Sequence, residues 1–133
     1  MLFAEDARFE GFGSAPDGAN ADVFVTGVSN RLKDAISVHQ CHTPEIALLT
    51  PECARGIWAM QDYLEWPHSI ELRESPGAFG FMGYGHYEEE YQLVNGSWKM
   101  SFLRLTRIRV DPLLKRTAPS SVLRSASRDW LVD

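Results

Sequence analysis

The chain has 133 residues, of which 44% are hydrophobic and 11% aromatic, and this suits a single domain with its own core. Charged residues make up 23% and the formal net charge is −5. The composition therefore argues against wholesale disorder, and against nucleic acid or an anionic membrane surface as a partner.

The sequence also bears on the cellular compartment of the protein. Its two cysteines, Cys41 and Cys53, are too few for a disulfide framework, and neither belongs to a CxxC pair. We interpret both as reduced thiols and expect a cytoplasmic protein. No apolar run reaches the roughly eighteen residues of a membrane span. The first residues, "MLFAEDARFEG", are acidic where a secretory signal is basic.

The first clear element is a helix between Asn20 and Ala35. Phe24, Val28 and Leu32 recur at helical spacing and fall on one stripe. Asp17, Gly18 and Asn20 precede the stripe and could turn and cap the chain. We expect this helix to end before the β-branched residues that follow.

Strand patterns continue to the end of the periodic region. The predicted strands are residues 36–42, 45–50, 54–66, 86–94 and 97–110. Residues 75–85, "SPGAFGFMGYG", are rich in glycine and proline, which favours a loop or an irregular entry to the next strand.

The last two predicted strands form a hairpin. Asn95-Gly96 stands between two alternating runs and is a strong turn signal. Tyr87 and Tyr91 share the more apolar face of the first arm. In the second arm the apolar alternation slips by one residue near Ser101 and Phe102, which predicts a β-bulge.

Long, bent antiparallel strands after a helix predict an α+β fold. The curved sheet would wrap around the helix and leave a pocket between the two. The periodicity is lost after Pro112. We therefore expect one domain over residues 1–112 and a C-terminal tail over residues 113–133. Trp130 and Leu131 could dock this tail on the body of the domain or on a neighbouring subunit.

Several segments also occur in the order found in a known family. They are "LFAEDARFEGFG", "SVHQCHTPEI", "ECARGIWAMQDYLEW", "GYGHYEEEY" and "NGSWKMSFLRLTRIRV". In these segments, over about residues 2–111, the chain resembles SnoaL-like proteins of the nuclear-transport-factor-two-like superfamily. The resemblance implies a cone-shaped α+β barrel, with a strongly curved, mostly antiparallel sheet wrapped on helices. It also implies proton transfer next to a carbonyl, as in dehydratases, polyketide cyclases and steroid isomerases, without metal or organic cofactor.

The resemblance implies that His39 is a general base, because it occupies the place of the catalytic histidine of the dehydratase branch. Imidazole suits this role, since its ordinary pKa lies near neutral pH. Family members pair this histidine with an aspartate on a first helix, ahead of Leu2 in this numbering. We expect the chain to lack that aspartate and to be a weak catalyst, unless Asp62 takes its place. A polar core histidine is the alternative interpretation of His39.

The candidate substrate-binding residues, all in predicted strands, are Trp58, Asp62, Tyr63, His86 and Tyr87. Asp62 shares the parity of Trp58, so a pocket position would make it a desolvated acid or base. An outward position is the commoner alternative. The aromatic residues could equally be ordinary core residues, and His86 could be a solvated or ion-paired histidine.

The remaining charged residues predict ion pairs between strands rather than a metal site. Residues 88–90 are three glutamates that alternate faces, so at least one points inward or is paired, with Arg104 or Arg107 as the expected partner. No metal is expected, because His42 lies on the opposite face of a strand from His39 and no third ligand is evident.

Two functions remain open. The first is a cofactor-independent lyase or isomerase of dehydratase or cyclase type, which acts on a cyclic, fairly apolar carbonyl or hydroxy compound with His39 as the base. The alternative is a non-catalytic ligand-binding or dimerisation module of the same fold. In either case we expect a homodimer through the outer face of the sheet, which would cover apolar side chains such as Trp58, Phe79 and Phe81.

Overall fold

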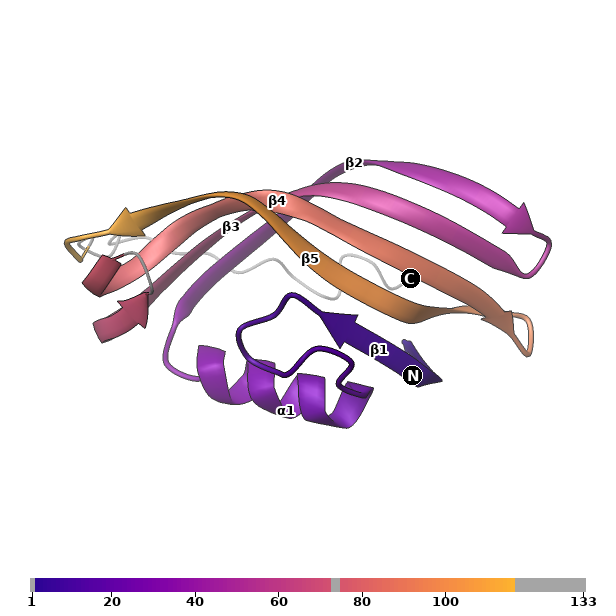
Figure 1. Cartoon of the computed structure of the whole chain (residues 1–133), viewed down its shortest axis with the longest axis horizontal. Coiled ribbons are helices and arrows are strands. Elements are labelled where there is room, and N and C mark those ends of the chain that lie inside the picture. The colour runs from indigo at the N-terminus through magenta and orange to yellow at the C-terminus, as the bar shows by residue number, and fades with distance from the viewer. Residues whose placement is uncertain (1, 73–74, 117–133) are drawn as a thin grey trace, which may run out of the picture.

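One curved sheet arches over one helix (Figure 1). The computed structural model describes residues 2–72 and 75–116. In chain order the elements are β1 (Phe3–Glu10), α1 (Ala21–Leu32), β2 (Ile36–Thr50), β3 (Cys53–Leu72), β4 (Ser75–Val94) and β5 (Ser97–Leu113). The strand order is β1-β5-β4-β3-β2, and all neighbours are antiparallel except β1 and β5. The predicted α+β fold with a curved, mostly antiparallel sheet is confirmed.

Of the three residues expected to turn and cap the chain, Asn20 is the N-cap of α1, and its side chain accepts a hydrogen bond from the backbone N–H of Val23 at 3.0 Å. Its apolar stripe of Phe24, Val28 and Leu32 faces a cavity under the sheet. None of the residues of α1 is fully buried, because the stripe borders open space rather than a filled core. No helix within the described residues is long and apolar enough to cross a membrane.

The strand β1 was not predicted from the sequence. It joins the open edge of β5 in parallel, with Phe9 opposite Leu103. The Phe9 side chain is 1% exposed, and its ring stacks on that of Phe24 with the centroids 4.0 Å apart. This contact holds α1 under the sheet, and edge-strand pairing with β1 covers hydrogen-bonding groups of β5.

Two local assignments from the sequence are corrected. The strand β2 is one continuous strand of 15 residues, with a register shift between Cys41 and Pro44 where two strands were expected. Residues 75–85 belong to β4 and are not a loop. A Cβ on Gly80 would lie 2.0 Å from the carbonyl oxygen of Leu64. Glycine therefore lets the strands approach closely here.

The predicted bulge in β5 is present. Tyr91 pairs with Met100, whereas Glu90 pairs with Phe102, so Ser101 is the extra residue. Beyond it the odd-numbered side chains of β5 point to the concave face of the sheet.

A second bulge in β5 was not predicted. Gly85 pairs with Arg107 and Tyr84 pairs with Arg109, which leaves Ile108 unpaired in register and 68% exposed. Past this point the even-numbered residues of β5 face the concave side.

Two clusters of buried side chains form the core. One contains Ala7, Phe9 and Leu103, and the other contains Leu64, Trp66 and Phe81. The indole N–H of Trp66 donates to the backbone carbonyl of Arg31 at 2.9 Å and so ties the end of α1 to β3. The predicted tail is described only as far as residue 116, so Trp130 and Leu131 lie outside the described residues.

The hairpin between β4 and β5 turns at Asn95 and Gly96, as predicted, with φ values of 51° and 77° that fit a type I′ turn. We expect Gly96→Ala to lower the free energy of unfolding by about 1 kcal/mol, because no atom lies near the new Cβ and only the left-handed φ is strained. Urea unfolding measures this. Gly13→Ala is the control, since Gly13 has open space and no positive φ. Equal effects of the two changes would contradict the explanation.

Candidate functional site

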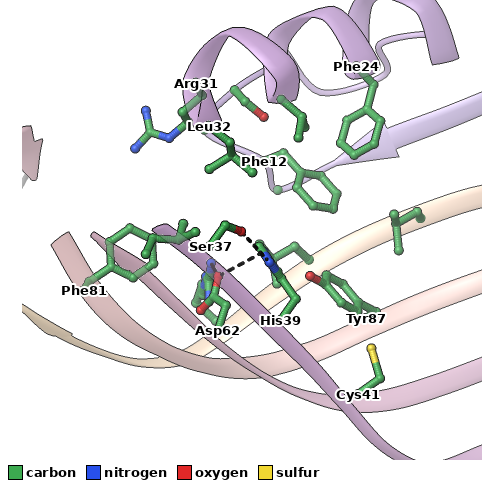
Figure 2. A pocket seen from close by; sticks show the side chains of 18 of the residues that line it. Phe12, Phe24, Arg31, Leu32, Ser37, His39, Cys41, Asp62, Phe81 and Tyr87 are labelled. Atoms are coloured by element: carbon green, nitrogen blue, oxygen red, sulfur yellow. Dashed lines mark hydrogen bonds and ion pairs between the residues drawn. The ribbon is translucent and has the colours of Figure 1, made fainter. Parts of the chain in front are cut away.

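A cavity of about 770 Å³ lies between the concave face of the sheet and α1. Its volume is in the range of small-molecule sites. Figure 2 shows Phe24 and Leu32 above it, with His39, Asp62 and Tyr87 below. The cavity lies where the sequence led us to expect a pocket, and His39 is among the residues that line it.

His39 lies on β2, with Ser37 and Cys41 on the same face. The Ser37 hydroxyl lies 3.1 Å from Nδ1 of His39, within hydrogen-bond distance. Nε2 of His39 lies 3.8 Å from Oδ2 of Asp62 (Figure 2). The imidazole is 38% exposed, so a ligand in the cavity can reach it. Both ring nitrogens thus have a polar neighbour, but only Nδ1 has one close enough for a hydrogen bond.

Asp62 points into the cavity and is 2% exposed, so the outward position expected as commoner is wrong. It lies on β3 directly opposite His39. Both of its oxygens accept hydrogen bonds from the guanidinium of Arg107, each at 2.6 Å. This bidentate arrangement is the strong geometry for a guanidinium and a carboxylate.

Gly83 makes room for this pair from the intervening strand. A Cβ there would lie 2.1 Å from Nη1 of Arg107 and 2.2 Å from Oδ1 of Asp62. The guanidinium also lies over the ring of Phe81, 5.4 Å from its centroid. A glycine inside a strand often marks a close approach, but the sequence pattern favoured a loop or irregular segment at Gly83, and the structure places it in β4.

Tyr87 lines the cavity beyond His39, and its ring stacks on Phe12 with centroids 6.4 Å apart. Burial, followed by the negative charge of Asp62, raises the pKa of Tyr87 to about 12. The phenol therefore remains a hydrogen-bond donor at neutral pH. Burial, followed by the charge of Glu89, also raises the pKa of the Cys41 thiol.

Three predicted site residues do not line this cavity. Trp58 lies on the concave face but its indole N–H donates to the Tyr91 hydroxyl at 2.9 Å. Tyr63 follows Asp62 on β3 and faces the convex side, where its hydroxyl donates a hydrogen bond to Glu65. His86 shares the convex face because side chains alternate along β4. The prediction that these residues line the pocket is wrong for the cavity described here.

Of the two arginines expected to pair with the glutamates of residues 88–90, only one does so. Arg104 pairs with Glu88 across the strands at 2.6 Å, as expected. This hydrogen bond, with a second from Thr106, lowers the pKa of Glu88. Arg107 instead pairs with Asp62. Within the described residues no group of three or more His, Cys, Asp or Glu side chains is arranged to hold a metal ion.

Comparison with known proteins places the chain among proteins of this fold. Residues 1–104 match the family model of the SnoaL-like domain. Hexachlorocyclohexane dehydrochlorinase LinA type 2 is 18% identical with a TM-score of 0.66, over 91% of this chain and 78% of that one. LinA type 3 from Novosphingobium barchaimii is 16% identical with a TM-score of 0.65, over 90% and 77%.

A proposed scytalone dehydratase from Novosphingobium aromaticivorans is 16% identical with a TM-score of 0.66, over 93% of this chain and 78% of that one. At these identities the similarity shows a shared fold. No sequence among the curated proteins matches the chain.

Removing the partner of Asp62 should destabilise the fold. We expect Arg107→Met to lower the free energy of unfolding by about 3–5 kcal/mol, because a buried carboxylate loses its cation. Chemical denaturation followed by circular dichroism measures the loss. Arg109→Met is the matched control, since its pair with Asp111 is 69% exposed on the arginine side and its loss should matter far less than the loss of the buried pair. The double change Asp62→Leu with Arg107→Met should recover much of the loss. Similar losses in the Arg107 and Arg109 variants would contradict a special role for the buried pair.

Proposed function

Because the chain belongs to the SnoaL-like domain family, we propose that it is a cofactor-independent lyase or isomerase that removes a proton next to a carbonyl of a cyclic, mostly apolar substrate. One observation carries this proposal: His39 stands in the cavity with Nε2 3.8 Å from the buried carboxylate of Asp62. Two solved structures of the same fold are named as a dehydrochlorinase and a proposed scytalone dehydratase. Both names describe eliminations, in which a proton is removed from carbon and a leaving group departs.

The proposed reaction needs the tautomer of His39 that carries its hydrogen on Nδ1. If Nδ1 carries the hydrogen, it donates to the Ser37 hydroxyl oxygen at 3.1 Å, and the lone pair stays on Nε2. The separation of 3.8 Å from Asp62 is longer than a hydrogen bond, so Nε2 is free to accept a proton from the substrate. In an elimination the C–H electron pair then forms a double bond as the leaving group departs. In an isomerisation His39 returns the proton to another carbon.

Asp62 stabilises the imidazolium that results. Two opposite charges 3.8 Å apart attract by about 4 kcal/mol at an effective dielectric constant of about 20. Arg107 offsets part of this attraction, because its positive charge contacts the same carboxylate. The geometric role of the pair is therefore at least as important as its charge, since Arg107 holds Asp62 in place beside His39. Asp62 thus does the work that the family assigns to an aspartate on its first helix.

The walls of the cavity suit a ring compound. Apolar side chains from α1 and from the strands surround the polar centre, among them Phe24, Leu64 and Leu105. Such walls bind a ligand by burying apolar surface, while a few polar groups set its orientation. The alternative, a ligand-binding module without turnover, uses the same walls and differs only in the role of His39.

The test measures proton exchange rather than a complete reaction, because the substrate is not identified. The purified protein is incubated with α-tetralone in deuterium oxide, and loss of the proton signal next to the carbonyl is followed by NMR. We expect His39→Ala to reduce the protein-dependent rate by about 100-fold or more. Asp62→Asn should also reduce it, by a smaller factor.

His42→Ala is the matched control, since His42 is an exposed histidine on the same strand that does not line the cavity. It should leave the rate unchanged. Ligand binding without protein-dependent exchange, or equal rates in the His39 and His42 variants, would favour the non-catalytic module instead.

We also propose a homodimer through the convex face of the sheet. On the β2–β3 part of this face Ile36, Val38 and Ile57 are 46–51% exposed. Phe81, expected earlier to be covered by a partner, is buried within its own chain at 7% exposure. Exposed apolar side chains on one face of a sheet are commonly covered in oligomers.

Light scattering after size-exclusion chromatography tests the dimer. We expect a mass of two chains for the parent protein and of one chain for the double variant Val38→Lys with Ile57→Lys, because two charges would be buried at the contact. Ile108→Lys is the control, since its side chain is exposed on β5, across β4 from β3. A parent protein with the mass of one chain would contradict the proposal.

A further inference from the structure

Glu89 is a cavity residue that the proposed chemistry does not use. Its two neighbours in the chain point to the convex face and are neutralised there, Glu88 by Arg104 at 2.6 Å and Glu90 by Arg55 at 2.6 Å. Glu89 points to the concave face and lines the cavity. Within the described part of the chain, it forms no ion pair with a lysine, arginine or histidine.

Other side chains hold Glu89 in position. The Tyr91 hydroxyl donates to Oε2 of Glu89 and accepts the indole N–H of Trp58 at 2.9 Å. Burial is the main cause that raises the pKa of Glu89, and the hydrogen bonds from Tyr91 and Trp58 offset it only in part. Placing a carboxyl group in such surroundings without a cation is unfavourable for folding, and groups of this kind gather at functional sites.

Glu89 lies away from the proton-transfer centre. Asp62 pairs with Gly83 on β4, and Glu89 is six residues further along the same strand. Six residues of strand correspond to about 20 Å of backbone. The distance between the side chains is shorter, because Glu89 lies close enough to Cys41, the neighbour of His39 on the same face of β2, for its charge to add to burial in raising the pKa of that thiol. Tyr87 lies between Asp62 and Glu89 on the same face. The cavity therefore extends along β4, with the pair of His39 and Asp62 near its middle and Glu89 towards one end.

We propose that Glu89 binds a hydroxyl group at the end of the ligand remote from the carbonyl, so that the site selects elongated hydroxy-ketones. This inference rests on the proposed function, because that function places the carbonyl at His39. A hydroxyl fits better than an ammonium group for two reasons. The walls near Glu89 are apolar, with Phe3, Met100 and Leu103 among them, and a neutral group costs less to desolvate than a charged one. A hydroxyl can also accept as well as donate, so it matches either protonation state of the carboxyl.

The experiment compares two ligands that differ in one group, 5α-androstan-3-one and its 17β-hydroxy derivative. Binding is measured by titration calorimetry, with tryptophan fluorescence as a second signal because Trp58 contacts Tyr91. We expect the hydroxy-ketone to bind the parent protein at least about tenfold more tightly than the plain ketone, as for a hydrogen bond to a charged or strongly polar group.

In Glu89→Leu this preference should disappear, while the affinity for the plain ketone stays within about threefold of the parent value, because its contacts with the walls are unchanged. Glu89→Gln keeps the shape and one acceptor, so it should retain an intermediate preference. Melting temperatures of both variants show whether they are folded. Glu90→Gln is the matched control, because this neighbouring glutamate is paired with Arg55 on the convex face.

Equal affinities of the two ketones for the parent protein, a preference that survives in Glu89→Leu, or binding of neither ketone would overturn the inference. Tighter binding of the 17β-amino derivative than of the hydroxy derivative would also overturn it, in favour of a cation site. His39→Ala separates this inference from the proposed function. It should reduce proton exchange by about 100-fold or more but keep the preference for the hydroxyl group, since Glu89 acts in binding alone.

Discussion

The ion pair between Asp62 and Arg107 is the constraint on which the other features depend, because a carboxylate that is 2% exposed needs a partner. The strand β3 supplies the carboxylate, β5 supplies the guanidinium, and β4 passes between them with Gly83 at the crossing. The pair therefore fixes how three strands lie relative to one another. It also places the negative charge beside His39, so one interaction serves both the fold and the proposed chemistry.

The space under the sheet follows from the way α1 is attached. The helix is held near its start by the stacking of Phe24 on Phe9 and at its end by the hydrogen bond from Trp66 to Arg31. Between these two points its apolar stripe borders the cavity. This apolar surface contributes little to stability in the free protein, because it borders open space. A ligand that covers it removes it from water and so stabilises the folded state. Ligand binding should therefore stabilise the helix more than the far ends of the strands.

Local signals predicted the helix, the Asn95-Gly96 turn and the first bulge, because each depends on a few neighbouring residues. The direction of Asp62 could not be predicted in this way, since it depends on which face of a whole strand lines the concavity. Arg107 was misassigned for the same reason, although the bulge that turns it inward was recognised. The second bulge, at Ile108, has no turn residue or break in composition to mark it. Gly83 allows the close approach of Asp62 and Arg107, but this could be inferred only once the pairing of Gly83 with Asp62 was known.

The parallel pairing of β1 with β5 has a consequence for the order of folding. Phe3 lies opposite Met100, so β1 pairs with the described strand that is furthest from it in the chain. During synthesis on the ribosome Phe9 and Ala7 have no sheet to join until nearly the whole domain has emerged. Contacts between such distant parts of a chain form slowly, because a long loop must close first. The pairing of β1 with β5 and the packing of α1 against β1, which complete one wall of the cavity, are thus expected to be the last parts of the native structure to form.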